Sequence, residues 1–87
     1  MQYFIDVEAS GLGIGSYPIE VGVALANGDT HCTLICPTSE WTHWDDQAEK
    51  LHCISRENLL LNGRSPLKVA MMLNAVSYTH LRAHETP

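Results

Sequence analysis

Two acidic side chains lie two residues apart in an otherwise apolar run near the start of the sequence. Asp6 and Glu8 fall within FIDVEASG, residues 4–11. Because side chains alternate between the two faces of a strand, both acids point to one face and Ile5 and Val7 to the other. At about 6 Å and an effective dielectric of about 20, two carboxylates repel by roughly 3 kcal/mol, so a partly buried pair favours a cation. Magnesium, which often takes one or two protein carboxylates together with water and phosphate, suits this spacing.

The same acidic spacing has a simpler explanation. D-x-E is a short motif, and an exposed edge strand can carry two solvated acids without any ligand. The spacing alone leaves both interpretations of Asp6 and Glu8 open.

Length and composition limit the range of functions. The sequence has 87 residues, of which 45% are hydrophobic and 17% charged, with a formal charge of -5, which is typical of one small globular domain. The acidic balance argues against a broad basic surface for nucleic acid, but not against an enzyme that reaches phosphates through metal ions. No signal peptide and no membrane-spanning run is visible, so we expect a cytoplasmic protein with no membrane partner.

The three cysteines, Cys32, Cys36 and Cys53, are predicted to be free thiols. The alternative is a zinc site that combines two of them with one histidine, His31, His43 or His52. Cys32 and Cys36 fall in a predicted strand, where four residues span about 13 Å, too far for one tetrahedral ion. The spacing therefore disfavours zinc.

The pattern of apolar residues predicts three strands followed by helices. Alternation indicates strands over residues 2–8, 17–26 and 30–37, and Asn27-Gly28 predicts a type I′ hairpin turn between the second and third. The first three elements are therefore expected to form an antiparallel meander.

Helix signals follow Pro37. Asp45 and Ser55 are candidate N-caps, Gly63 a candidate C-terminal residue, and Ser65-Pro66 a cap followed by proline at the first helical position. The last helix is indicated by four residues that recur at helical spacing, Leu67, Ala70, Met71 and Asn74. The methionines are predicted to fill the core. Trp41 and Trp44 are expected to pack inside, with base stacking as the alternative.

Taken in order, five stretches resemble the DnaQ-like, or DEDD, 3′-to-5′ exonucleases over nearly all of residues 2–74. They are FIDVEASGL, SYPIEVGVAL, the Asn-Gly hairpin, LICP and AEKLHCISRENLLLNG. The resemblance implies an α/β, ribonuclease H-like fold, here truncated to the antiparallel three-stranded meander and the helices after it.

The resemblance also implies a site. Asp6 and Glu8 match the family's first catalytic acids, which hold two divalent ions, Mg²⁺ or Mn²⁺, that activate water and stabilise the leaving oxygen. The implied substrate contacts are Ala9, Ser10, Leu12, Leu51, His52 and Ile54. The three aliphatic side chains in this set are equally compatible with the core. Cys53 departs from the family pattern, which often has glycine there.

The last stretch has a different origin in our interpretation. Val76 to Thr86 reads like one translation frame of a transposon-based sequencing adapter, with Ala75 partly adapter-derived. Residues 75–87 are therefore set apart as a probable adapter-derived tail. Residues 1–74 are expected to be the N-terminal part of a longer exonuclease domain.

The implied function is a metal-dependent hydrolase that cleaves phosphodiester bonds at 3′ ends of single-stranded DNA, RNA or short oligonucleotides. The family's later aspartates and its catalytic histidine or tyrosine have no match in residues 1–74, so this chain is expected to be inactive as it stands. Two alternatives remain: a non-catalytic nucleic-acid-binding or interaction domain of the same fold, and a small structural module unrelated to nucleic acid. A homodimer is a further assembly to consider.

Overall fold

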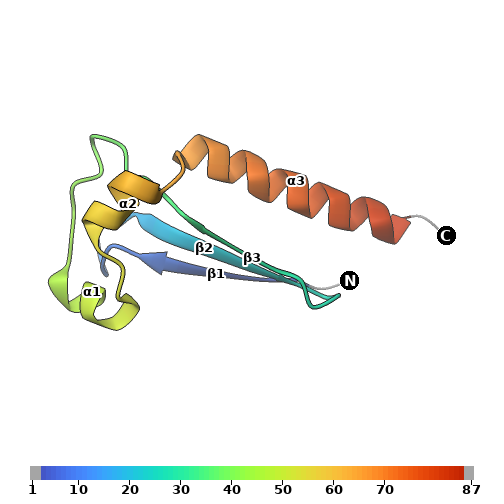
Figure 1. The fold of residues 1–87 in the computed structure, drawn as a ribbon, viewed down its shortest axis with the longest axis horizontal. Coiled ribbons are helices and arrows are strands. Elements are labelled where there is room, and N and C mark those ends of the chain that lie inside the picture. The colour runs from blue at the N-terminus through green and yellow to red at the C-terminus, as the bar shows by residue number, and fades with distance from the viewer. Residues whose placement is uncertain (1–2, 86–87) are drawn as a thin grey trace.

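The computed structural model describes the backbone of residues 3–85 and the side chains of residues 3–76. Three antiparallel strands are followed by three helices, as the alternation and cap signals predict (Figure 1). The elements are β1 (Tyr3–Ala9), β2 (Pro18–Leu25), β3 (Thr30–Leu34), α1 (Asp46–His52), α2 (Arg56–Asn62) and α3 (Pro66–Glu85). An α/β class with an antiparallel meander is thus confirmed.

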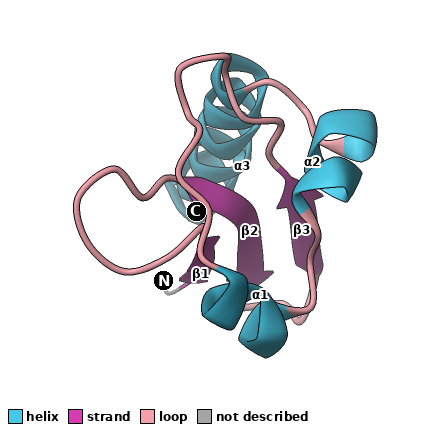
Figure 2. Cartoon of the chain, turned by 90° about the vertical axis from the view of Figure 1, so that its left-hand side faces the viewer, coloured by secondary structure: helices cyan, strands magenta, loops and turns pink. Residues whose placement is uncertain are grey.

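The strands lie side by side in the order β1-β2-β3, which leaves β1 at an edge of the sheet (Figure 2). Asp6 lies opposite Gly22 of β2, and Glu8 lies opposite Glu20. A bulge follows Glu8, where the register between β1 and β2 shifts. The bulge marks the point at which the chain leaves the sheet for the glycine-containing loop.

The β2–β3 hairpin is present, but its predicted type I′ turn is wrong. Type I′ needs positive φ at both central residues, whereas here only Gly28 takes a positive φ, of 95°. Gly28 N donates to Leu25 O at 3.0 Å and Leu25 N to Asp29 O at 2.8 Å, which closes a three-residue loop. The Asn27 side chain accepts from Asp29 N at 2.9 Å. That local hydrogen bond stabilises Asn27 without a left-handed backbone.

One face of the sheet packs against α3. Val21 and Val23 of β2 form a buried cluster with Ile35 and with Val69 of α3. The prediction that the methionines fill the core is wrong for Met71, which is 63% exposed, and Leu67 is 72% exposed. Nearly every side of this helix carries apolar residues, so the position of the sheet decides which side is buried. The buried side consists of Val69 with Leu73 and Val76 beside it.

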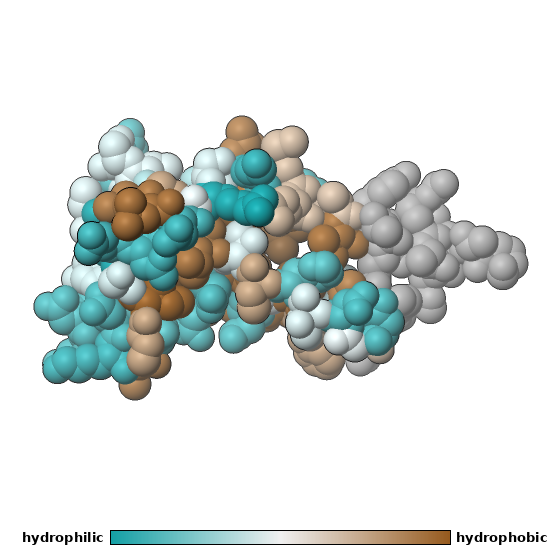
Figure 3. Space-filling view, viewed as in Figure 1, coloured by the Kyte–Doolittle hydropathy of each residue, from teal (hydrophilic) through white to brown (hydrophobic). Residues whose placement is uncertain are grey.

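A second buried cluster joins the start of β2 to α2. Tyr17, Ile19 and Leu59 are each at most 4% exposed. Both tryptophans pack against this cluster, which confirms their expected interior role. The rings of Tyr17 and Trp41 stack with centroids 5.4 Å apart. Outside this cluster, apolar side chains also reach the surface around α2 (Figure 3), where Leu61 is 75% exposed.

The predicted helix caps are confirmed. Asp45 accepts from Gln47 N at 2.9 Å, Ser55 from Asn58 N at 3.1 Å and Ser65 from Lys68 N at 3.2 Å. Gly63 ends α2 for a steric reason rather than through a left-handed backbone, because a Cβ there would lie 2.5 Å from Cys36 N. The close approach lets residue 64 pair with Ile35 just after β3.

The third strand is shorter than predicted. It ends at Leu34, because the chain then bridges to Arg64 and reaches Pro37, which has no N–H to donate. α3 continues through residues 75–85, the stretch interpreted as adapter-derived. Across the described residues, no helix is both long and apolar enough to cross a membrane.

Candidate functional site

The two acids of β1 share a face of the sheet, as their spacing predicts. Asp6 is exposed and Glu8 is half-buried. Because Glu8 lies opposite Glu20, a third carboxylate projects from the same face, which is the one turned away from Val21, Val23 and α3. Sequence reasoning did not assign Glu20 to the site. Alternation places Glu20 in the second strand, but no sequence signal sets the register that brings it opposite Glu8.

The donor chemistry of this face fits a divalent cation. Asp6 and Glu8 offer carboxylate oxygens, the ligands that Mg²⁺ and Mn²⁺ prefer. Within the described part of the chain, no group of three or more His, Cys, Asp or Glu side chains is placed to hold a metal ion. The two acids alone do not make up such a group, so a divalent ion held here would take its remaining ligands from water, from a phosphate or from other protein groups.

An open cavity of about 620 Å³ lies where β1 ends, between the loop after it and α1. It brings together five of the eight residues that the sequence nominates: Glu8, Ala9, Leu12, Leu51 and His52. Lys50 and Asp45 also line the cavity and add one positive and one negative charge. Glu8 and Leu51, which are 43 positions apart in the sequence, thus line one cavity.

The apolar side chains of this cavity are exposed. Leu12 is 94% exposed and Leu51 is 88% exposed, so neither belongs to the core. Gly13 and Gly15 both have positive φ, which carries the loop outward beyond Leu12. Two leucines facing water next to a carboxylate indicate a surface that contacts something else.

His52 is fixed in orientation by its neighbours. Its Nδ1 accepts from Ile54 N at 3.0 Å, and its ring meets Trp44 edge-on with centroids 5.8 Å apart. The proton of the neutral ring is therefore on Nε2. That nitrogen is buried, and no described residue pairs with it. Buried donors normally have a partner, so the Nε2–H is an exception among the described residues, and it does not face the solvent.

The structure places Ser10 and Ile54 inside the fold rather than in this cavity. Ser10 is fully buried, and its Oγ accepts from Tyr17 N at 3.1 Å. Its backbone N–H and C=O bond to Tyr17 O and Asp45 N. Ser10 thereby ties the end of β1 to the start of α1. Ile54 packs against the cluster around Leu59.

The remaining candidate, Asp6, does not line the cavity. It lies two residues before Glu8 on the same face of β1. All three cysteines are free.

Cys53 occupies a glycine-like position at the end of α1. Its φ is 60°, the one positive φ among the described residues other than glycine. Because the left-handed region is strained for a residue with a Cβ and Cys53 is exposed, Cys53→Gly should raise the free energy of unfolding by about 0.5–1 kcal/mol. Urea unfolding followed by circular dichroism measures this change. Cys32→Gly, in β3 with ordinary φ, should instead destabilise the chain, and a loss of stability in both variants would contradict the strain at Cys53.

Comparisons with known proteins do not assign this chain to a family. Neither the protein-family models nor the curated protein sequences gave a match.

Proposed function

We propose that this chain is the N-terminal part of a metal-dependent 3′-to-5′ exonuclease with a ribonuclease H-like fold, acting in the cytoplasm. The observation that carries the proposal is the cavity at the end of β1, where Glu8 lies beside the exposed Leu12 and Leu51. With a divalent cation on the acid, this arrangement suits a ligand that has a phosphate backbone and flat apolar bases.

In this proposal Asp6 and Glu8 hold the divalent ions, Mg²⁺ or Mn²⁺, through their carboxylate oxygens. When bound, these ions supply an activated water and stabilisation of the leaving oxygen. Glu20 adds negative charge to the same face and so strengthens the attraction for cations.

The remaining groups of the cavity bind and orient the 3′ end. Leu12 and Leu51 contact the face of the terminal base, which gives little preference among bases because every base has an apolar face. Lys50 also lines the cavity and attracts the phosphate. The ring of His52 lines the same cavity beside Leu51 and adds to the surface that meets the nucleotide.

A non-catalytic nucleic-acid-binding domain of the same fold is the second candidate. It is favoured by the same cavity together with the absence, from residues 1–74, of matches to the family's later acids. The downstream sequence separates the two. Two further aspartates, the last preceded at short spacing by histidine or tyrosine, support the enzyme.

The decisive experiment compares the 87-residue chain with the protein extended by its genuine downstream sequence in place of residues 75–87. Both are assayed on a 3′-labelled single-stranded oligonucleotide with Mg²⁺ or Mn²⁺. We expect cleavage by the extended protein and none by the shorter chain. The shorter chain has only two carboxylates to hold the positive charge of the metal ions, whereas the family uses four. Cleavage by neither protein, with retained oligonucleotide binding by the extended one, would support the binding domain instead.

A further inference from the structure

His43 lies where the two walls of the cavity at the end of β1 are joined. One wall is the loop that carries Gly11 and Leu12, and the other is α1 with Leu51. His43 is half-buried and does not line the cavity, but its ring lies directly against Gly11. The sequence suggested this histidine only as an alternative zinc ligand, and the proposed function so far gives it no role.

The ring of His43 is bonded to the buried hydroxyl of Ser10. Ser10 Oγ accepts from Tyr17 N at 3.1 Å and lies 3.3 Å from His43 Nδ1. Because Ser10 is fully buried, its hydroxyl proton needs an acceptor, and the ring nitrogen is the acceptor that the described residues place within reach. The neutral ring therefore accepts at Nδ1 and carries its own proton on Nε2.

The same ring fills the space beside Gly11. A Cβ at residue 11 would lie 2.6 Å from His43 Cε1 and 2.9 Å from Asp45 Cβ, so the absence of a side chain lets the loop approach both. Asp45 N donates to Ser10 O at 3.1 Å, and Asp45 is the N-cap of α1. The loop wall and the helix wall are consequently fixed to each other beside His43.

Beyond Leu12 the loop has little support. Gly13 has a positive φ of 109°, and no described atom lies within 4 Å of a Cβ built there. Ile14, the next residue, is fully exposed. The position of Leu12 relative to Leu51 is therefore set on the other side of Leu12, where His43 lies.

We propose that His43 is a positioning residue for the nucleotide site. It holds the turn at Ser10 and Gly11 so that Leu12 and Leu51 contact the terminal base together. It does so through the hydrogen bond from the Ser10 hydroxyl to Nδ1 and through the packing of its ring against Gly11. This role rests on the proposed function, because it needs a nucleotide in the cavity.

Hydrogen exchange measured by NMR on the 87-residue chain tests the contact without substrate. His43→Phe keeps a ring beside Gly11 but removes the acceptor, whereas His43→Asn presents a carbonyl oxygen close to the place of Nδ1. The amides of Ser10, Tyr17 and Asp45, which bond to Tyr17 or Ser10, should exchange at least about fivefold faster in His43→Phe, the factor that one net hydrogen bond contributes. In His43→Asn they should exchange at nearly the original rate.

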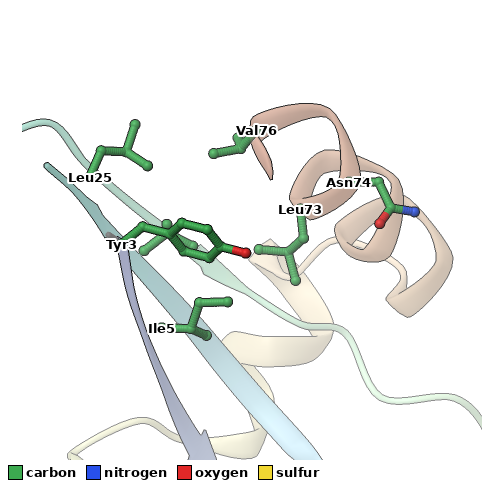
Figure 4. Close-up of a pocket in the computed structure, with 7 residues that line it drawn as sticks. Tyr3, Ile5, Leu25, Leu73, Asn74 and Val76 are labelled. Atoms are coloured by element: carbon green, nitrogen blue, oxygen red, sulfur yellow. The ribbon is translucent and has the colours of Figure 1, made fainter. Parts of the chain in front are cut away.

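The amide of Leu25 is the reference for a general loss of stability. It donates to Asp29 O at 2.8 Å. Leu25 lies at the opposite end of β2 from Tyr17, beside Tyr3 and near α3 (Figure 4). Its exchange rate should be the same in all three proteins.

Kinetics of the extended protein test the role in the nucleotide site. On a 3′-labelled oligonucleotide with Mg²⁺, His43→Phe should raise KM about fivefold or more and leave kcat within about twofold. The reason is that a base contact away from the reacting phosphate is lost equally in the ground state and the transition state. His43→Asn should bring KM back to within about twofold of the original value.

His31→Phe is the matched control, because it makes the same chemical change at an exposed position of β3. Its KM and kcat should equal those of the unmodified protein. Circular dichroism establishes that all the variants are folded.

Several results would overturn the proposal. On the 87-residue chain they are unchanged exchange in His43→Phe, or exchange that is equally faster at Leu25, which would make His43 a general contributor to stability. In the extended protein they are a lower kcat with unchanged KM, or equal effects of His43→Phe with either His43→Asn or His31→Phe. An extended protein that neither binds nor cleaves the oligonucleotide would overturn the proposed function and this role with it, whatever the exchange rates show of the contact.

Discussion

Asp6→Asn is expected to lower phosphodiester cleavage by the extended protein at least about a hundredfold while leaving the fold intact. Replacing a carboxylate beside a divalent ion with a neutral amide removes more than about 4 kcal/mol of attraction at an effective dielectric of about 20, because two unit charges about 4 Å apart already attract by that much. Even half of that loss, if it falls on the transition state, lowers the rate by more than a factor of about ten, and the whole loss lowers it by about a thousandfold. The fold should persist because Asp6 is exposed and has no hydrogen-bond or salt-bridge partner among the described residues.

The measurement is kcat/KM for cleavage of a 3′-labelled oligonucleotide with Mg²⁺, together with urea unfolding of each variant. Asp29→Asn is the matched control, because it makes the same chemical change at an exposed position beside the β2–β3 hairpin. We expect its activity to equal that of the unmodified protein. Full magnesium-dependent activity in Asp6→Asn would show that Asp6 holds no catalytic metal.

Leu59→Ala is expected to lower the free energy of unfolding by about 2–5 kcal/mol. Leu59 is completely buried between α2 and the start of β2, where Ile19 is also 0% exposed. Truncation there removes apolar burial and leaves a space that the neighbouring tryptophans fill only in part. Since small domains have little stability to lose, we expect this variant to unfold at a much lower urea concentration.

Leu61→Ala is the control for that prediction. It removes the same atoms two residues later in the same helix, but Leu61 is 75% exposed. Its free energy of unfolding should change by less than about 0.5 kcal/mol. Equal losses in the two variants would contradict the prediction, because they would mean that the packing of Leu59 contributes no more than the exposed Leu61 does.

The sequence by itself determined the features that depend on neighbouring residues. Alternation in β1 places Asp6 and Glu8 on one face wherever the strand lies, because successive side chains of a strand point to opposite sides. The caps at Asp45 and Ser55 were predictable for the same reason, since each side chain bonds to an amide two or three residues away. Meander order and helix starts follow from such short-range geometry.

Only the tertiary structure decided which apolar residues are buried. Leu12, Leu51 and Ile54 are alike in sequence terms, yet two are exposed around the cavity and Ile54 packs against the core. In α3, likewise, the sheet buries Val69 and leaves Met71 outside. Burial depends on which distant elements meet a side chain, and neither residue type nor helical spacing contains that information when most sides of an element are apolar.

The position of Glu20 was decided in the same way. Its own strand is clear from alternation, but its place opposite Glu8 depends on the register between β1 and β2. A shift of one residue would have turned it to the other face, because side chains alternate with a period of two. The register is set by the burial of Val21 and Val23 against α3. Packing on one face of the sheet thus determines which charges meet on the other.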